Sequence, residues 1–301
     1  MDHDEGLDVQ KLKNFERIQS VEVSGRVHEV ELCCARYPAV EIPNLVIVSY
    51  LPNKQAAQIL EICLDAIRKY TLIDHQVWVV DNNSPEEQVD RLVAQSECNL
   101  ILNRTEPIGS ASSSSATQTS NGSYANGIAL ELACWFIPED SKFVMPLHMD
   151  TMPCSKGWLS FLMSRIEGNV RAAGVRMDKR RESAGVLHVL GYLLDYQLYK
   201  RLGLSFMPNL PRYDVGDLVT LGLRSAGYDV FACRNTLWVP ELVELLPDDS
   251  PFKLFSVDRS FDDDGNVIFL HLGRGVRKTF GTETRGVTPL QWIDFAKQFV
   301  L

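Results

Sequence analysis

A run of apolar, mostly β-branched residues, Leu45–Tyr50, constrains the fold of this chain more than any other segment. Such a run, without polar alternation, is typical of a strand buried on both faces of a parallel sheet. After it, Asn53 can cap a helix whose apolar positions from Ala56 to Ile67 follow a helical period. Because parallel strands need a crossover connection, this order of elements predicts a βαβ unit.

The same alternation continues along the chain. The sequence predicts strands at Val77–Val80, Asn99–Leu102 and Lys142–Leu147, with a helix from Pro85 and another at Tyr124–Ile137. Strand-helix-strand repetition of this kind indicates right-handed crossovers and a parallel sheet covered by helices. The expected fold class is therefore α/β.

The second half of the chain is predicted to be more irregular. Further elements are expected as helices at Gly157–Ile166, Val189–Leu202 and Asp214–Ala226, and as strands at Arg171–Arg176, Asp229–Cys233 and Asn266–His271. The Ser-, Thr- and Gly-rich segment Gly109–Ser123 is predicted to be a flexible loop. Residues 1–40 alternate weakly and are interpreted as an N-terminal extension with one hairpin.

Composition excludes several classes of function. A formal net charge of −9 over 301 residues argues against a nucleic-acid partner. The longest apolar runs are strand-sized, so no transmembrane segment is predicted, although peripheral membrane contact stays open. The first residues, MDHDEGLDVQK, have the wrong chemistry for a secretory signal, and we expect a cytoplasmic protein.

Polar side chains gather where predicted strands end. In an open α/β sheet, ligands bind beyond the carboxyl ends of the strands. The residues at these ends are Ser49-Tyr50, Asp81-Asn82-Asn83-Ser84, His148-Met149-Asp150 and His271. The first strand is followed by neither the GxGxxG fingerprint nor a P-loop, which argues against nicotinamide, flavin and P-loop enzymes.

An ordered series of motifs resembles the family 2 glycosyltransferases of the nucleotide-diphospho-sugar transferase superfamily. The motifs are Val46–Tyr50, Cys63–Ile67, VVDNNSPE at Val79–Glu86, Tyr124–Gly127, MPLHMDTMP at Met145–Pro153, Gly157–Leu159 and Tyr213–Val230. The resemblance implies a GT-A fold, in which helices sandwich a Rossmann-like, mostly parallel sheet. It also implies an inverting enzyme that moves a sugar from a nucleoside-diphosphate sugar to a hydroxyl of a saccharide or glycoconjugate.

The resemblance divides the chain into parts. Residues 1–43 are the extension, and residues 44–275 form the glycosyltransferase domain. Within that domain, residues 44–150 make the nucleotide-sugar-binding half and residues 151–275 the acceptor half. Residues 276–301 form a C-terminal tail or helix.

The resemblance also assigns the donor site. Asp81 is expected to accept a hydrogen bond from the nucleotide base. Ser84-Pro85-Glu86-Glu87 is a good helix start by itself, with Asn82 and Asn83 as turn formers, but this does not require Asp81. The other expected donor-binding residues are Ser49, Tyr50, Asn83, Asn126 and Arg274. Arg274 lies in a glycine-containing basic stretch that could close over a diphosphate.

A divalent metal is implied at the end of the fourth strand. Asp150 is well placed to hold Mg²⁺ or Mn²⁺ across the diphosphate of the donor. The family usually has an acidic residue where this chain has His148, and an imidazole can also ligate Mn²⁺. In many relatives a histidine near the position of His271 completes the metal shell.

The catalytic base is the least settled assignment. Inverting transfer needs a carboxylate that takes the acceptor proton, and the family pattern is Glu-Asp-x-Asp-Leu. Here the sequence reads Asp214-Val215-Gly216-Asp217-Leu218, with Val215 at the usual base position. Either Asp214 or Asp217 must substitute, although both also suit a helix start.

Two alternatives therefore remain. One is a non-catalytic GT-A-like protein that binds a nucleotide or saccharide and has lost the base. The other is a nucleotidyltransferase, but that class normally has a glycine-rich basic loop after the first strand. Leu51-Pro52-Asn53-Lys54 contains one lysine and no glycine.

Overall fold

The structure, a computed structural model, describes residues 17–33, 40–95, 97–106, 115–176 and 185–301. Within these residues the strands form one 12-stranded sheet. They are β1 (Arg17–Val23), β2 (Arg26–Cys33), β3 (Asn44–Ser49), β4 (Gln76–Asn82), β5 (Asn99–Asn103), β6 (Phe143–His148), β7 (Thr151–Pro153), β8 (Val170–Arg176), β9 (Leu187–Asp195), β10 (Asp229–Asn235), β11 (Asp258–Phe261) and β12 (Val267–His271). Their order in the sheet is β1-β2-β5-β4-β3-β6-β9-β8-β10-β11-β12-β7.

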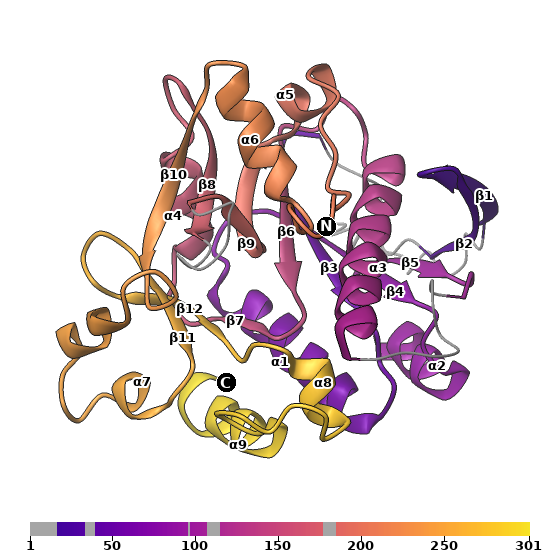
Figure 1. Ribbon diagram of the computed structural model, residues 1–301. Coiled ribbons are helices and arrows are strands. Elements are labelled where there is room, and N and C mark those ends of the chain that lie inside the picture. The colour runs from indigo at the N-terminus through magenta and orange to yellow at the C-terminus, as the bar shows by residue number, and fades with distance from the viewer. Residues whose placement is uncertain (1–16, 34–39, 96, 107–114, 177–184) are drawn as a thin grey trace, which may run out of the picture.

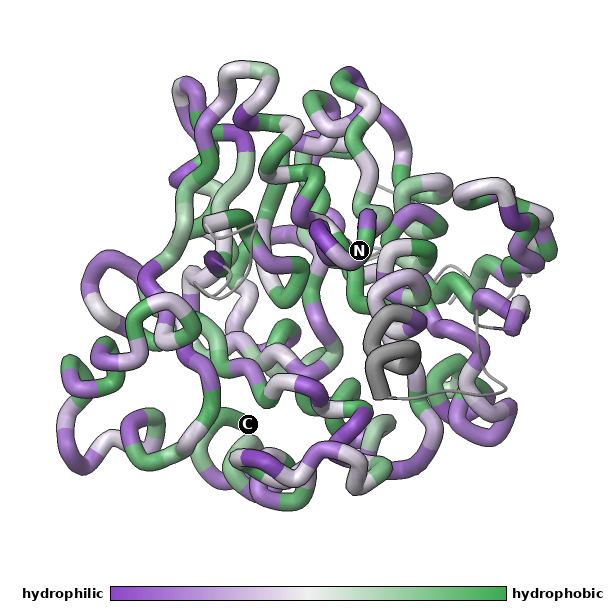
Figure 2. Tube along the Cα trace, in the orientation of Figure 1, coloured by the Kyte–Doolittle hydropathy of each residue, from purple (hydrophilic) through white to green (hydrophobic). Residues whose placement is uncertain are grey.

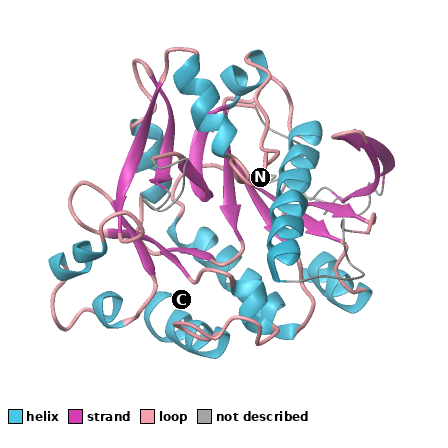
Figure 3. Ribbon diagram, in the orientation of Figure 1, coloured by secondary structure: helices cyan, strands magenta, loops and turns pink. Residues whose placement is uncertain are grey.

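Helices surround this sheet (Figure 1, Figure 3). They are α1 (Lys54–Tyr70), α2 (Glu86–Gln95), α3 (Ser115–Phe136), α4 (Trp158–Ser164), α5 (Tyr196–Arg201), α6 (Asp217–Ser225), α7 (Pro251–Leu254), α8 (Gly275–Thr279) and α9 (Pro289–Phe295). A 3₁₀ helix, η1 (Pro240–Leu245), and a π-helical turn, η2 (Ala296–Val300), complete the described elements.

The centre of the sheet is parallel, as predicted. β5, β4, β3 and β6 are neighbours and run in one direction. Beyond β6 the sheet turns antiparallel through β9, and the far strands β11, β12 and β7 pair antiparallel with one another. The carboxyl ends of the four central strands therefore meet at one edge of the sheet.

Consecutive residues of β3 belong to two different hydrophobic cores. Leu45 and Ile47 pack with residues of α1, whereas Val46 packs with residues of α3. This follows from the two-residue period of a strand, which turns alternate side chains to opposite faces. Full burial of each aliphatic side chain contributes about 1.5–3 kcal/mol. The apolar run is therefore a strand covered on both faces.

The predicted N-terminal hairpin is confirmed in the described residues. Ser24 and Gly25 have φ values of 51° and 77°, as a two-residue hairpin turn requires. β2 then pairs antiparallel with β5, from Val30 opposite Asn103 to Cys33 opposite Leu100. The hairpin is thus an integral end of the sheet.

The predicted helix Val189–Leu202 is wrong in its first part. β9 occupies Leu187–Asp195, and a helix begins only at Tyr196, where Asp195 Oδ1 accepts the Leu198 N–H at 2.9 Å. β9 lies between β6 and β8 and is buried over most of its length. Hydrophobic periodicity cannot distinguish such a strand from a buried helix.

The predicted loop Gly109–Ser123 is wrong over residues 115–123, which form the start of α3. Residues 109–114 lie outside the described residues. The second half of α3 packs in the core around Ala129 and Leu132. Extending a helix from such a packed segment is far easier than nucleating one, so Ser- and Thr-rich residues can continue it.

No helix in the described ranges is long and apolar enough to span a bilayer. In Figure 2, hydrophilic and hydrophobic residues are interspersed along the coloured part of the trace.

Candidate metal centre and donor site

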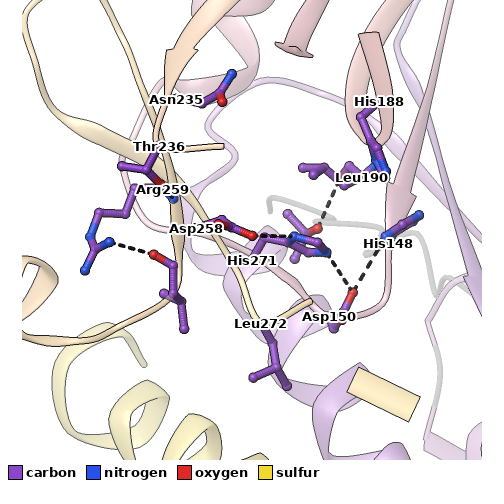
Figure 4. A network of polar contacts seen from close by, with 12 residues as sticks. His148, Asp150, His188, Leu190, Asn235, Thr236, Asp258, Arg259, His271 and Leu272 are labelled. Atoms are coloured by element: carbon purple, nitrogen blue, oxygen red, sulfur yellow. Dashed lines mark hydrogen bonds and ion pairs between the residues drawn. The ribbon is translucent and has the colours of Figure 1, made fainter. Parts of the chain in front are cut away.

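Two strand ends bring together a histidine, an aspartate and a second histidine (Figure 4). His148 is the last residue of β6, and Asp150 follows it by two positions. His271 ends β12 and lies opposite Thr151 in the antiparallel pair with β7. One ligand atom from each of His148, Asp150 and His271 lies within 4.8 Å of the others. The structure therefore brings together the three residues that the sequence singled out as metal ligands.

Asp150 is at the centre of this cluster. Its Oδ1 lies 3.8 Å from His148 Nδ1 and 3.4 Å from His271 Nε2. Its other oxygen, Oδ2, accepts the Gly275 backbone N–H at 2.8 Å. One carboxylate oxygen is therefore held by the backbone, while the other faces both imidazoles.

Asp258 supports the cluster from behind. Its Oδ2 lies 3.5 Å from His271 Nδ1, on the side of the ring away from Asp150 (Figure 4). A carboxylate behind a histidine typically orients the ring and raises its basicity as a ligand. Sequence reasoning missed Asp258, because its place depends on the register that sets it opposite His271 across β11 and β12.

The three cluster residues fit a divalent cation such as Mn²⁺. Both ring nitrogens of His271 are buried and have no hydrogen-bond partner of good geometry. A carboxylate with two imidazoles can bind such an ion. The Gly275 N–H and Asp258 supply the outer contacts that metal ligands usually have.

Burial and neighbouring charges set the charge state of each of the three cluster residues. Burial opposes charge on His271, but Asp150 and Asp258 outweigh it and raise its pKa to about 10. Burial prevails at His148, where the pKa falls to about 4 although Asp150 opposes this. Burial also acts against the charge on Asp150, yet the two histidines hold the pKa of its carboxyl well below the ordinary range. At neutral pH, the His148 ring is therefore uncharged, with a lone pair on one of its two nitrogens, and a cation at His271 must displace a proton.

Gly275 allows α8 to approach the cluster. A Cβ at this position would lie 2.9 Å from both Cβ and Oδ2 of Asp150. Only glycine leaves room for the backbone N–H to reach the carboxylate directly.

A third histidine lies beside the cluster. The His188 ring, on β9, meets the His148 ring edge-to-face, with 5.2 Å between ring centroids. Its Nδ1 accepts the Leu190 N–H at 2.9 Å. The mistaken helix at Val189–Leu202 concealed this residue, because only a strand paired with β6 carries His188 to the same edge.

The predicted donor residues at β3 and β4 form a tight network. Asp81 is 1% exposed, and it accepts Ser84 Oγ–H at 2.5 Å, Ser84 N–H at 2.9 Å and Ser49 Oγ–H at 3.3 Å. Burial raises the pKa of Asp81 although the two serines oppose the shift. Tyr50 is 36% exposed, and Asn83 has a left-handed φ of 57°. Asp81 thus fixes the loop, and Tyr50 is the most accessible of these residues.

Asn126 and Arg274 lie on segments next to the cluster. Asn126, on α3, places its side-chain nitrogen 3.4 Å from His148 Nε2. Arg274 has a left-handed φ of 58° directly before α8, and its guanidinium pairs with Glu283. The structure therefore places Asn126 against His148 of the cluster and pairs Arg274 with Glu283.

The two candidate bases differ in surroundings. Asp217 is 2% exposed and its Oδ2 accepts the Asp214 N–H at 2.9 Å, a contact that fixes the start of α6. Asp214 is half-buried, its Oδ1 accepts the Val215 N–H at 2.8 Å, and its charge helps raise the pKa of His148 against burial. Asp214 is therefore the more accessible carboxylate and acts on the cluster electrostatically.

A cavity of about 390 Å³ lies elsewhere, between α1 and α2. Leu51, Leu60, Gln88 and Arg91 are among its lining residues, and none of the three cluster residues lines it. The convergence of ligand groups, rather than this hollow, locates the candidate site.

Comparison with known proteins supports the architecture. No protein-family profile matches the chain, and no curated protein matches its sequence. The galactosyltransferase LgtC, solved with donor and acceptor sugar analogues, matches 86% of this chain and 96% of its own at 13% identity and a TM-score of 0.52. The chain has a GT-A fold.

Two further glycosyltransferase structures match less of the fold. The mannosyltransferase PcManGT from Pyrobaculum calidifontis, in complex with GDP-Man and Mn²⁺, is 17% identical over 66% of this chain, with a TM-score of 0.45. The match spans 56% of that mannosyltransferase. TarS from S. aureus, residues 1–349, is 14% identical over 55% of this chain and 50% of its own, with a TM-score of 0.35.

Proposed function

We propose that this protein is a metal-dependent glycosyltransferase. It would transfer a sugar from a nucleoside-diphosphate sugar to a hydroxyl of a saccharide or glycoconjugate. The observation that carries the proposal is the convergence of His148, Asp150 and His271 at the carboxyl edge of a GT-A sheet. That edge is where open α/β sheets bind their ligands.

The cluster residues would hold Mn²⁺ or Mg²⁺. When bound, the cation neutralises charge on the leaving nucleoside diphosphate. Asp150 supplies a carboxylate oxygen, and the Gly275 N–H keeps that carboxylate in place. His148 and His271 supply imidazole nitrogens from two strands.

The neighbouring strand ends would bind the donor. Tyr50 and Asn83 flank the network in which Asp81 binds Ser49. We assign the nucleoside to this side because β3 lies next to β6 in the sheet and β4 lies next to β3. Arg274 would exchange Glu283 for the diphosphate, since a guanidinium binds phosphate oxygens as readily as carboxylate oxygens.

Asp214 is our candidate base for an inverting displacement. It would take the acceptor proton while the acceptor oxygen attacks the anomeric carbon from the face opposite the diphosphate. The greater exposure of Asp214 supports this choice over Asp217, whose carboxylate is buried and bound to backbone.

A second function, binding without catalysis, has specific support. Both Asp214 and Asp217 accept backbone N–H groups at the start of α6, which is a structural task. Val215, at the usual position of the base, is 8% exposed. A protein that had lost the base would keep the metal cluster and the donor site.

The first experiment is a thermal-shift screen against UDP, GDP, dTDP and CDP, with and without Mn²⁺. A nucleotide at 100 to 1,000 times its dissociation constant stabilises a protein by roughly 2.7–4.1 kcal/mol. We expect a Mn²⁺-dependent shift with one nucleotide in the wild type and none in Asp150→Asn. A full shift in Asp150→Asn would contradict the proposed metal site.

Turnover separates the two functions. ¹H NMR of the product formed from the matching donor sugar would reveal transfer and the anomeric configuration. An inverted configuration is expected. Retention would refute the role of Asp214, and binding without turnover across a panel of acceptors would favour the non-catalytic protein.

A further inference from the structure

The His148 ring has two different neighbours. Its Nδ1 faces Asp150 Oδ1 at 3.8 Å, while its Nε2 lies 3.4 Å from the side-chain nitrogen of Asn126 on α3. The ring therefore lies between a carboxylate that can only accept a hydrogen bond and a carboxamide that can donate or accept one.

Without a cation, the two neighbours favour one tautomer. A hydrogen on Nδ1 points toward the Asp150 carboxylate, and the Nε2 lone pair accepts from the Asn126 NH₂ group. This arrangement gives Nε2 a hydrogen-bond donor and places the Nδ1 hydrogen in favourable electrostatic contact with the carboxylate, 3.8 Å away. It also turns a hydrogen, rather than a lone pair, toward the cluster.

A cation beside Asp150 requires the other tautomer. His148 can ligate through Nδ1 only if its hydrogen is on Nε2. The NH₂ group of Asn126 would then oppose another N–H. A half-turn of the carboxamide about its Cβ–Cγ bond replaces NH₂ by the carbonyl oxygen, which accepts from Nε2.

We propose that Asn126 is a positioning residue of the metal centre, and that its carboxamide reverses when the cation binds. The inference rests on the proposed metal-dependent function. It explains why an amide suits this place, since leucine could serve neither tautomer and aspartate only the metal-binding one. The carboxamide nitrogen lies 3.4 Å from Nε2, and a half-turn would bring the carbonyl oxygen to about the same place.

Other amides fix the location of Asn126. Asn82 Nδ2, at the end of β4, donates to the Ala125 carbonyl at 3.0 Å, and Asn103 Nδ2 donates to Asn82 Oδ1 at 3.3 Å. The backbone next to Asn126 is thereby attached to two strands of the parallel core. Because α3 is held in this way, the half-turn of the carboxamide, rather than a shift of the helix, would accommodate the cation.

The test measures Mn²⁺ binding to the full chain by calorimetry and EPR. Loss of an outer contact to a metal ligand typically weakens metal affinity 10–100-fold. We expect Asn126→Leu to show such a loss, Asn126→Asp to bind at least as tightly as the wild type, and the exposed control Asn266→Leu to be unchanged. Thermal melts check that each variant is folded.

The tautomer can be observed directly. Long-range ¹H–¹⁵N spectra distinguish hydrogen on Nδ1 from hydrogen on Nε2, and the His148 signals are assigned with His148→Gln. In the wild type we expect the hydrogen to move from Nδ1 to Nε2 on saturation with diamagnetic Mg²⁺. If Asn126 had a purely structural role, the Asn126→Leu variant would leave the His148 tautomer of the metal-free protein unchanged.

Several results would overturn the inference. They are Mn²⁺ affinity of Asn126→Leu within twofold of the wild type, equal weakening in the Asp and Leu variants, and an unchanged His148 tautomer at saturating Mg²⁺. Absence of Mn²⁺ binding by the wild-type chain would overturn the proposed metal-dependent function as well. Normal binding by Asn126→Leu would overturn this inference alone.

Discussion

Gly275→Ala is the sharpest steric test of the metal centre. The added Cβ would lie 2.9 Å from Asp150 Cβ and Oδ2. Carbon atoms prefer a separation of about 3.5–4.0 Å, so Asp150 or α8 must retreat by about 0.6 Å or more. That movement lengthens the 2.8 Å bond from the Gly275 N–H to the carboxylate.

The size of the effect follows from the same contacts. Metal ligands must be held to within about 0.5 Å, and disturbing an outer contact weakens metal affinity by about 10–100-fold. This corresponds to about 1.4–2.8 kcal/mol of binding free energy. Overpacking in a tight site typically lowers the free energy of unfolding by about 1–3 kcal/mol as well.

The assay is Mn²⁺ titration by calorimetry, with a thermal melt of each protein. Gly122→Ala is the matched control, because nothing lies within 4 Å of its added Cβ on α3. It should bind Mn²⁺ normally, and a helical Gly-to-Ala change should not destabilise the protein. If Gly275→Ala bound Mn²⁺ within twofold of the wild type, the Gly275–Asp150 contact could not position the metal ligand.

Three further predictions test other contacts. Asp258→Asn, which removes the charge behind His271, should weaken Mn²⁺ binding about 10–100-fold; unchanged affinity in calorimetry would remove Asp258 from the site. Asp214→Asn should lower kcat about 10²–10⁴-fold with donor affinity retained, whereas Asp217→Ala should lower the free energy of unfolding by about 1–3 kcal/mol in urea titrations, because the Asp214 N–H loses its acceptor; the reverse pattern would exchange their roles. Burial lowers the pKa of His28 below its ordinary value of 6.5. Below that pH the unfolded state therefore binds more protons than the folded state, and the stability that the neutral ring contributes is lost as the pH falls. The stability of the wild type relative to His28→Gln should therefore decrease between pH 7 and pH 5 in urea titrations, and a pH-independent difference would contradict it.

The parallel core could be predicted because its signals are local. Leu45–Tyr50 reads as a doubly buried strand without any knowledge of its neighbours, and Asn53 caps α1 as predicted, with Oδ1 accepting the Ala56 N–H at 3.1 Å. Strand ends in such a sheet meet at one edge, so the motif that contains His148 and Asp150 located part of the site as well.

The remainder depended on pairing that the sequence does not display. The sequence predicts a helix over β9 because Val189–Leu194 is apolar throughout, and only its place between β6 and β8 makes it a strand. Asp258 and His188 enter the site through register, from partners far away in the chain. The base assignment stays a prediction, since Asp214 and Asp217 lie three residues apart at the start of α6 and both bind backbone.

The N-terminal hairpin has a practical meaning for truncated forms of this protein. Cutting the chain before β3 would turn β5 into an open edge, with unpaired N–H and C=O groups from Leu100 to Asn103. Such edges promote aggregation. Asn103 would also lose its contact with His28, 3.4 Å away across the pair, in the amide chain that leads to α3. A shortened chain that starts at β3 would therefore be expected to be less soluble and to have a less ordered candidate metal site, so the smallest useful fragment includes both strands of the hairpin.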